Sequence, residues 1–142
     1  MKLLLLPTIL LTATAAHAQT CFSVWQYVQC SSNGPSSVIA STAAGPGYGG
    51  GGSPSWCTAY CNTNAPSATY AGIITQQTNG QYTSYCRCGV LSPNSPPIVP
   101  DGAACYYPCA YSSKTEAMCR DGTCRCGGPR AYSIYTKVTV CP

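Results

Sequence analysis

The sequence predicts a small, disulfide-rich α+β domain in which one main helix packs on a twisted antiparallel sheet. The chain of 142 residues contains 12 cysteines and only 7% charged residues, a composition typical of domains stabilised by disulfides. Cys57 and Cys61 are four residues apart, so on a helix their sulfur atoms share one face. Cys86 and Cys88 are two residues apart, so on a strand they also share one face.

The helix that carries Cys57 and Cys61 has clear boundaries in the sequence. Ser53 supplies a hydroxyl for the N-cap, and Pro54 is well suited to the first helical turn. Two asparagines and then Pro66 predict that the helix ends after about two and a half turns.

A β-hairpin is expected directly after this helix. Residues 70–75 predict a strand and residues 81–88 the returning strand. Between them lies Asn79-Gly80, the strongest short sequence pattern for a two-residue hairpin turn. The cysteine faces of helix and strand then meet, which predicts pairing between two sets: Cys57 and Cys61 with Cys86 and Cys88.

Two more strands are expected near the ends of the domain. Residues 21–30 alternate well and hold apolar groups on both faces, which favours a central strand. Residues 131–140 are rich in β-branched and aromatic residues and predict a closing strand. Residues 31–55 are expected to form a loop, in which 41–55 is a flexible stretch rich in Gly, Ser and Pro. Residues 105–109 contain a proline and predict a tight turn.

Residues 1–18 have the features of a secretory signal peptide. Lys2 supplies a positive charge, residues 3–11 are mostly apolar, and Ala16-His17-Ala18 fits a cleavage site. The apolar run is too short to span a bilayer, so no membrane span is expected. Residues 19–142 are expected to form a single domain, which is monomeric, secreted, and either extracellular or associated with a cell wall.

The segments around the cysteines resemble those of a known family. In chain order they are Tyr27-Val28-Gln29-Cys30, Cys57-x3-Cys61, Tyr70-Ala71-Gly72, Cys86-Arg87-Cys88-Gly89, Cys105-Tyr106-Tyr107-Pro108-Cys109 and Cys126 through Tyr135. Together they resemble a WSC domain over most of residues 22–137. The resemblance implies a helix on an antiparallel sheet, similar to PAN/apple domains. It also implies non-catalytic binding of carbohydrate, as in the cell-wall proteins, commonly fungal, that contain such domains.

The resemblance suggests a second group of paired cysteines, and the positions of the others suggest two more bridges. The second group is Cys30, Cys105, Cys109 and Cys126. The extra bridges are expected between Cys119 and Cys124, and between Cys21 and Cys141 near the chain ends. The spacing C-x3-C…C-x-C recurs at 105/109…124/126, so a tandem of two modules is an alternative, against which Pro108 argues.

Several functions are disfavoured by the residue types present. The basic residues beyond the signal peptide are scattered between Arg87 and Lys137, without the run that nucleic-acid binding favours. No histidine remains after signal-peptide removal to serve a catalytic triad. The only carboxylates are Asp101, Glu116 and Asp121, two of which lie in turn sequences. Cysteine spacings also fit zinc, but secretion favours disulfides. No catalytic residue, metal or other cofactor is therefore expected.

Aromatic side chains are the remaining candidates for binding a ligand. Tyrosine and tryptophan faces stack on sugar rings while their O–H or N–H makes a polar contact. Tyr70, Tyr132 and Tyr135 are expected in the core, and Tyr85 is a further surface candidate. A cell-wall polysaccharide of the glucan, chitin or xylan class is the expected partner, bound by Tyr106, Tyr107, Trp25, Tyr48 and Tyr82. Two alternatives remain: a secreted effector or antimicrobial-type protein that binds a host protein or a membrane on the same scaffold, and a passive structural protein of the wall.

Overall fold

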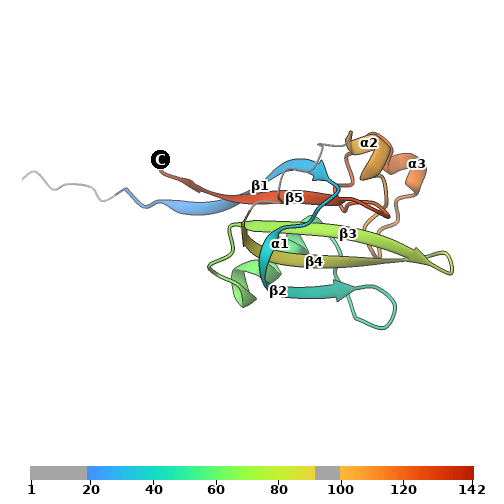
Figure 1. Ribbon diagram of the computed structural model, residues 1–142, viewed down its shortest axis with the longest axis horizontal. Helices are drawn as coiled ribbons and strands as arrows, with labels where there is room; N and C mark the ends of the chain where they lie inside the picture. The colour runs from blue at the N-terminus through green and yellow to red at the C-terminus, as the bar shows by residue number, and fades with distance from the viewer. Residues whose placement is uncertain (1–18, 92–99) are drawn as a thin grey trace, which may run out of the picture.

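The protein is built on a five-stranded antiparallel sheet (Figure 1). This computed structural model describes residues 19–91 and 100–142, so the predicted signal peptide lies outside the described residues. In chain order the elements are β1 (Phe22–Ser31), β2 (Ser36–Ala44), α1 (Pro54–Asn64), β3 (Tyr70–Thr78), β4 (Gln81–Leu91), α2 (Asp101–Ala104), α3 (Glu116–Cys119) and β5 (Tyr132–Val140). The strand order is β1-β5-β3-β4-β2. The predicted small α+β domain with an antiparallel sheet and many disulfides is confirmed.

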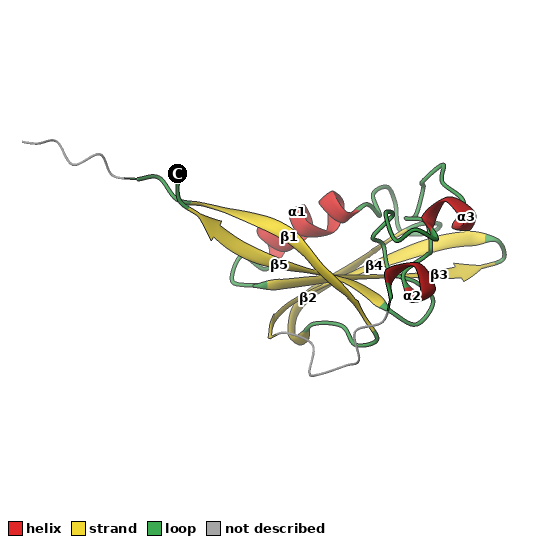
Figure 2. Ribbon diagram, turned by 90° about the horizontal axis from the view of Figure 1, so that it is seen from above, coloured by secondary structure: helices red, strands yellow, loops and turns green. Residues whose placement is uncertain are grey.

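The hairpin of β3 and β4 forms as predicted. The two strands pair along their length, and Thr78 lies opposite Gln81 beside the turn. Asn79 and Gly80 have φ angles of 52° and 75°, the left-handed conformations that a type I′ turn requires. The backbone twist of this turn matches that of the flanking strands, and the twist of the sheet is visible in Figure 2.

α1 begins where the sequence predicts and, with 11 residues, runs about half a turn further than predicted. The Ser53 hydroxyl accepts a hydrogen bond from the backbone N–H of Trp56 at 3.2 Å, and Pro54 is the first helical residue. At the other end the N–H of Ala65 donates to the carbonyl oxygen of Cys61 at 2.9 Å. Side-chain hydroxyl and proline geometry thus fix where the helix begins.

Two buried disulfides join α1 to β4. They are Cys57–Cys86 and Cys61–Cys88, within the two sets that the helix and strand periodicities predict. All four residues are excluded from solvent. The helix also contacts an edge of the sheet, because the Tyr60 hydroxyl donates to the carbonyl oxygen of Ser41 at 3.0 Å.

β1 is an edge strand, so the prediction of a central position is wrong. Its apolar residues have other contacts: Trp25 and Tyr27 pack at the margin of the core near α1, while Val24 lies opposite Val138 on the other face. β5 pairs with β3 only over Ser133–Thr136, so its last residues pair with β1 alone. The resulting two-stranded ribbon projects from the sheet in Figure 1 and is closed by the predicted bridge Cys21–Cys141.

β2 forms the other edge where the sequence predicts a loop over 31–55. It pairs with β4 from Ser36 to Ala44, with a bulge between Val38 and Ala40. Ser37 has a φ of 49°, and Val38 and Ile39 are both largely exposed. Mixed small residues and an irregular register hide the period of two that identifies a strand. The predicted flexible stretch 41–55 is therefore strand as far as Ala44.

The chain after residue 100 packs on the same side of the sheet as α1. Buried hydrogen bonds attach it: the Thr75 hydroxyl donates to the carbonyl oxygen of Cys126 at 2.7 Å, and the Ser84 hydroxyl accepts from the N–H of Ala110 at 2.9 Å. Thr75 and Ser84 also contact each other at 2.9 Å. One disulfide, Cys30–Cys105, joins this segment to β1, and two more, Cys109–Cys126 and Cys119–Cys124, close loops within it; all three join expected partners.

The interior holds few large aliphatic side chains. Ile73 and Ile134 are the largest fully buried hydrophobic residues in the described parts of the chain. Around Ile73 the core consists mainly of half-cystines and alanines, with Tyr135 at its margin. Covalent bonds therefore replace much of the apolar contact that a domain of this size otherwise needs.

Alkaline pH is expected to destabilise this fold. The Tyr27 hydroxyl donates to Asp101 at 2.6 Å, and the Tyr135 hydroxyl donates to the carbonyl oxygen of Arg125 at 2.7 Å. Burial raises the pKa of both tyrosines above the ordinary value, and the hydrogen bond to Asp101 raises that of Tyr27 further. Folding thus favours the protonated phenols.

Because a raised pKa stabilises the fold only while the group stays protonated, this contribution is complete below about pH 10 and declines as the pH rises above it. Denaturant unfolding at a series of pH values, followed together with tyrosinate absorbance, measures the effect. Ionisation of every tyrosine near its ordinary pKa, with no loss of stability, would contradict this expectation.

Candidate functional site

The face of the sheet opposite α1 is hollowed into a groove. Cys86 and Cys88 are bonded to α1, so the alternation of β4 turns Tyr85 and Arg87 to the opposite face. The groove has a volume of about 600 Å³. Phenol, hydroxyl, amide and guanidinium groups all contribute to its lining, which comprises Ser41, Thr42, Ala43, Tyr48, Ile74, Gln76, Tyr85, Cys86, Arg87 and Tyr132.

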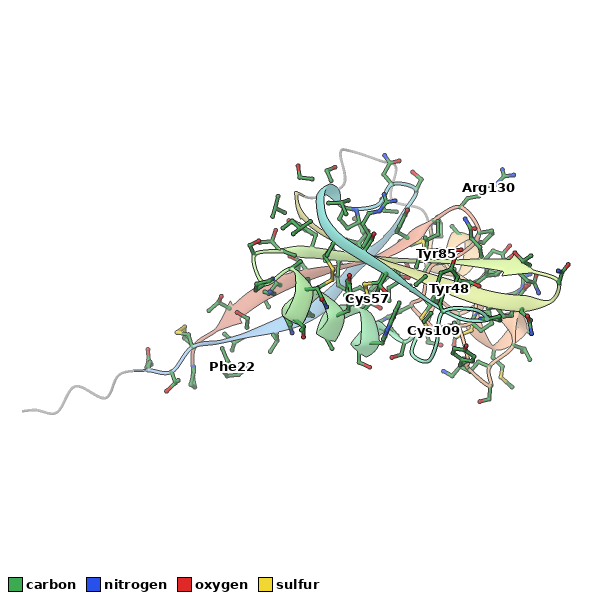
Figure 3. All side chains as sticks on the ribbon, turned by 90° about the horizontal axis from the view of Figure 1, so that it is seen from below. Phe22, Tyr48, Cys57, Tyr85, Cys109 and Arg130 are labelled. Carbon is green, nitrogen blue, oxygen red and sulfur yellow. A yellow bond between two sulfur atoms is a disulfide. The ribbon has the colours of Figure 1, made fainter. Side chains whose placement is uncertain are left out.

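Tyr48 reaches the groove from the loop between β2 and α1. The N–H of Tyr48 donates to the carbonyl oxygen of Gly45 at 2.9 Å, and the N–H of Gly45 donates to Gly49 at 3.3 Å. Positive φ angles at both glycines permit this tight turn. The ring of Tyr48 packs edge-to-face against Tyr85, with centroids 6.3 Å apart. Both residues are labelled in Figure 3. Tyr48 remains 61% exposed and can therefore meet a ligand.

Tyr85 forms the inner half of this ring pair. It is partly buried, whereas Tyr48 is exposed. Burial raises the pKa of Tyr85, and the neighbouring Tyr48 raises it further. The Tyr85 phenol therefore stays protonated at neutral pH and can donate a hydrogen bond.

A glycine in β3 lets Tyr132 approach Arg87 across an intervening strand. Gly72 lies opposite Arg87 in β4 and opposite Ile134 in β5. A Cβ atom at position 72 would lie 3.2 Å from the ring of Tyr132 and 2.6 Å from Cδ of Pro35. With no side chain there, Cζ of Arg87 lies 5.5 Å from the Tyr132 ring centroid. At this distance the ring attracts the guanidinium and restricts its position.

A second group of aromatic residues lies outside the groove. The ring centroids of Tyr82 and Tyr107 are 5.3 Å apart, and those of Tyr106 and Tyr107 are 5.2 Å apart. Cζ of Arg120 lies 4.7 Å from the Tyr106 centroid. The Tyr82 hydroxyl donates to Glu116 at 2.8 Å, and burial together with this hydrogen bond raises the pKa of Tyr82 to about 12.

The rings of this second group are nearly perpendicular. The Tyr106 and Tyr107 planes meet at 87°, and those of Tyr82 and Tyr107 at 70°. Adjacent rings in this arrangement cannot present one flat surface to an extended sugar chain. Tyr106 also borders a hollow of about 450 Å³, whose other lining residues are Ser32, Ala103, Ala104, Pro129, Arg130 and Ala131.

Trp25 lies apart from both groups of tyrosines. Its indole N–H donates to the side-chain oxygen of Asn62 at 3.0 Å, near the end of α1. Nζ of Lys137 lies 4.9 Å from its ring centroid. Of the five predicted binding aromatics, the structure thus gathers Tyr82, Tyr106 and Tyr107, places Tyr48 in the groove, and leaves Trp25 beside the helix.

Among the residues that line the groove, the sequence predicts only Tyr48 as a binding residue and Tyr85 as a further surface candidate. Arg87 and Tyr132 are two of those that it does not assign to the site. The sequence marks Arg87 only as one of several scattered basic residues. The prediction of a core position for Tyr132 is wrong, because Tyr132 is only partly buried and lines the groove. The alternation that places Cys86 and Cys88 toward α1 could have identified Arg87, together with Tyr85, as residues of the opposite face. The position of Tyr132 beside the groove depends on the strand order, which the sequence does not reveal.

The described cysteine and carboxylate groups, which could in principle bind a metal or act in catalysis, are engaged in disulfides or hydrogen bonds within the protein. The sulfur atoms of Cys57, Cys61 and Cys86 lie within 4.8 Å of one another, but each belongs to a disulfide and is not a thiolate. The carboxylates of the whole chain accept hydrogen bonds from three different partners: Asp101 from Tyr27, Glu116 from Tyr82, and Asp121 from the backbone and side chain of Thr123.

No protein-family model matches the chain, and neither a curated protein nor a solved structure matches it. Among the described helices, none is both long and apolar enough to cross a membrane. The residues that line the groove therefore provide the basis for proposing a function.

Proposed function

We propose that the protein is a secreted, non-catalytic carbohydrate-binding module that holds a cell-wall polysaccharide of the glucan, chitin or xylan class in the groove opposite α1. The observation that carries this proposal is the lining of the groove. The exposed ring of Tyr48 and the partly buried rings of Tyr85 and Tyr132 lie beside hydroxyl and amide groups on one face of the sheet. Six disulfides stabilise this scaffold. A monomer with one such groove is sufficient for this role.

Most groups of the groove suit the apolar faces and the hydroxyls of a sugar chain. The exposed ring of Tyr48 can pack on the apolar face of a sugar, while phenol O–H groups bind its hydroxyls. Ser41 and Gln76 supply further donors and acceptors. A groove of this kind implies weak binding, with dissociation constants on the order of micromolar to millimolar. Many sites on an insoluble polymer then give useful retention.

The scaffold supports the same proposal through its resemblance to a WSC domain. In this proposal α1 is the main helix of a PAN/apple-like domain and packs on the twisted sheet. Within the eight family cysteines, the pairs are Cys30–Cys105, Cys57–Cys86, Cys61–Cys88 and Cys109–Cys126. The six disulfides also suit an oxidising compartment outside the cell.

Removal of the Tyr48 ring is expected to weaken polysaccharide binding about tenfold, since an aromatic contact contributes up to about 1.5 kcal/mol. Tyr48 is exposed on a glycine turn, so Tyr48→Ala should leave the fold intact. The measurement is retention on insoluble glucan, chitin and xylan, with Tyr85→Phe as a milder second variant. The double variant Tyr106→Ala, Tyr107→Ala serves as a matched control in the other aromatic group.

Retention lost in the control but kept in Tyr48→Ala would place the ligand on Tyr106 and Tyr107 instead of in the groove. Absence of retention of the native protein on every polysaccharide would reject the carbohydrate function.

A protein- or membrane-binding effector is the second candidate, favoured by exposed apolar side chains on the ribbon. Phe22 is 54% exposed and lies opposite Val140, which is also exposed. A ligand bound there would contact the ribbon instead of the groove. Loss of a host-protein or vesicle interaction in Phe22→Ser, without any effect of Tyr48→Ala, would support this candidate.

A further inference from the structure

We infer that Arg87 makes the groove select polysaccharides that carry carboxylate groups, such as xylans substituted with uronic acids. This inference rests on the proposed function, because it assigns a ligand class to the same groove. It narrows the proposed glucan, chitin or xylan partner to polymers that bear negative charge.

Arg87 is held in place by its strand. β4 lies between β3 and β2, and Arg87 is paired with Gly72 on one side and Ser41 on the other. Its backbone is thus fixed by two neighbouring strands. Its guanidinium lies 5.5 Å from the Tyr132 ring centroid, while the residue remains exposed. A cation restrained in this way loses less freedom on binding than one on a mobile loop.

No carboxylate of the protein lines the groove. The chain has only three acidic residues, and all three accept hydrogen bonds elsewhere, from Tyr27, Tyr82 and Thr123. Arg87 therefore contributes a positive charge that no acidic side chain of the groove offsets. An anionic ligand would supply the missing charge, and the planar guanidinium binds a carboxylate through two parallel hydrogen bonds.

Arg87 and the aromatic pair can contact one chain of sugars together. Tyr85 and Arg87 are two residues apart on the same face of β4, a separation of about 7 Å along the strand. Tyr48 packs on Tyr85 and extends the aromatic surface. A sugar that packs on Tyr48 thus places a neighbouring acidic sugar, or an acidic side group, within reach of the guanidinium.

The test compares one polymer in two chemical forms. Xylan that carries glucuronic acid side groups is used directly and after chemical reduction of its carboxyl groups to alcohols. The native protein is expected to bind the acidic form about tenfold more tightly. A hydrogen bond to a charged group typically lowers a dissociation constant by at least about this factor. Arg87→Gln keeps hydrogen-bond donors but removes the charge, and should bind both forms like the native protein binds the reduced polymer.

A charge-matched control separates a specific contact from general attraction. Arg130→Gln removes one positive charge from an exposed residue that does not line the groove and that projects outward in Figure 3. It is expected to keep the tenfold preference. The role of Arg87 would be overturned if Arg87→Gln and Arg130→Gln lost the preference for acidic xylan equally, or if the native protein bound both polymer forms equally. Binding of neutral carbohydrate would then still stand. Failure to bind either form would instead reject the proposed function itself.

Discussion

Reduction of all six disulfides is expected to unfold the protein at room temperature. Each disulfide typically contributes about 2–4 kcal/mol, whereas the entire stability of a typical domain is about 5–15 kcal/mol. Ile73 and Ile134 are the largest hydrophobic residues fully buried in the described structure, so little apolar packing remains to hold a reduced chain. The half-cystines themselves form much of the core. Near-UV circular dichroism before and after complete reduction measures the effect.

Loss of a disulfide between α1 and β4 is expected to destabilise the protein more than loss of the disulfide at the end of the ribbon. Replacing Cys57 and Cys86 by alanine removes a fully buried bridge and leaves a cavity, and is expected to cost about 2–5 kcal/mol. The matched control replaces Cys21 and Cys141, which are exposed, so no core packing is lost. A fully reduced protein that kept its near-UV spectrum and melted cooperatively would show that the apolar core suffices.

The Gly127→Ala substitution is expected to destabilise the protein by about 4 kcal/mol or more, a loss seen only when buried structure is disrupted. Gly127 has a φ of 76°, and its N–H donates to the buried Ser133 hydroxyl at 2.9 Å. A Cβ atom there would overlap the carbonyl oxygen of Ile73 and lie 2.6 Å from that of Ala131. Both obstacles are backbone atoms, so neither can rotate away.

Gly80 provides the matched control for this substitution. Its φ of 75° is nearly the same, but an added Cβ would meet nothing within 4 Å. Gly80→Ala should therefore cost only the strain of a left-handed alanine, about 1–2 kcal/mol. Denaturant unfolding of both variants measures the difference, and equal losses would show that overlap at Gly127 is relieved by movement of the backbone.

The helix and the hairpin could be predicted because their sequence patterns are local. Ser53 and Pro54 define a helix start, and Asn79-Gly80 defines a turn, with no information needed from the rest of the chain. The spacings of Cys57/Cys61 and Cys86/Cys88 then predict disulfides that join this helix to the second strand of the hairpin. Backbone geometry and covalent chemistry were enough for this part of the fold.

β2 and the groove could not be predicted because both depend on distant partners. β2 is held by backbone hydrogen bonds to β4, and its small side chains give no regular pattern. The groove joins Tyr48 from a glycine-rich loop, Tyr85 from β4 and Tyr132 from β5. Their proximity follows from the strand order, in which the last strand lies between the first and the third. No single segment of the sequence carries that information.

The Cys21–Cys141 bridge determines how the folded protein would carry tension. A force that pulls residue 20 away from residue 142 enters at Cys21, passes through the disulfide and leaves at Cys141. The strands, α1 and the groove lie outside this load path, so their hydrogen bonds bear no tension. A molecule stretched between residues 20 and 142 would therefore neither lengthen nor unfold while the disulfide held, and Tyr48, Tyr85 and Arg87 would keep their arrangement.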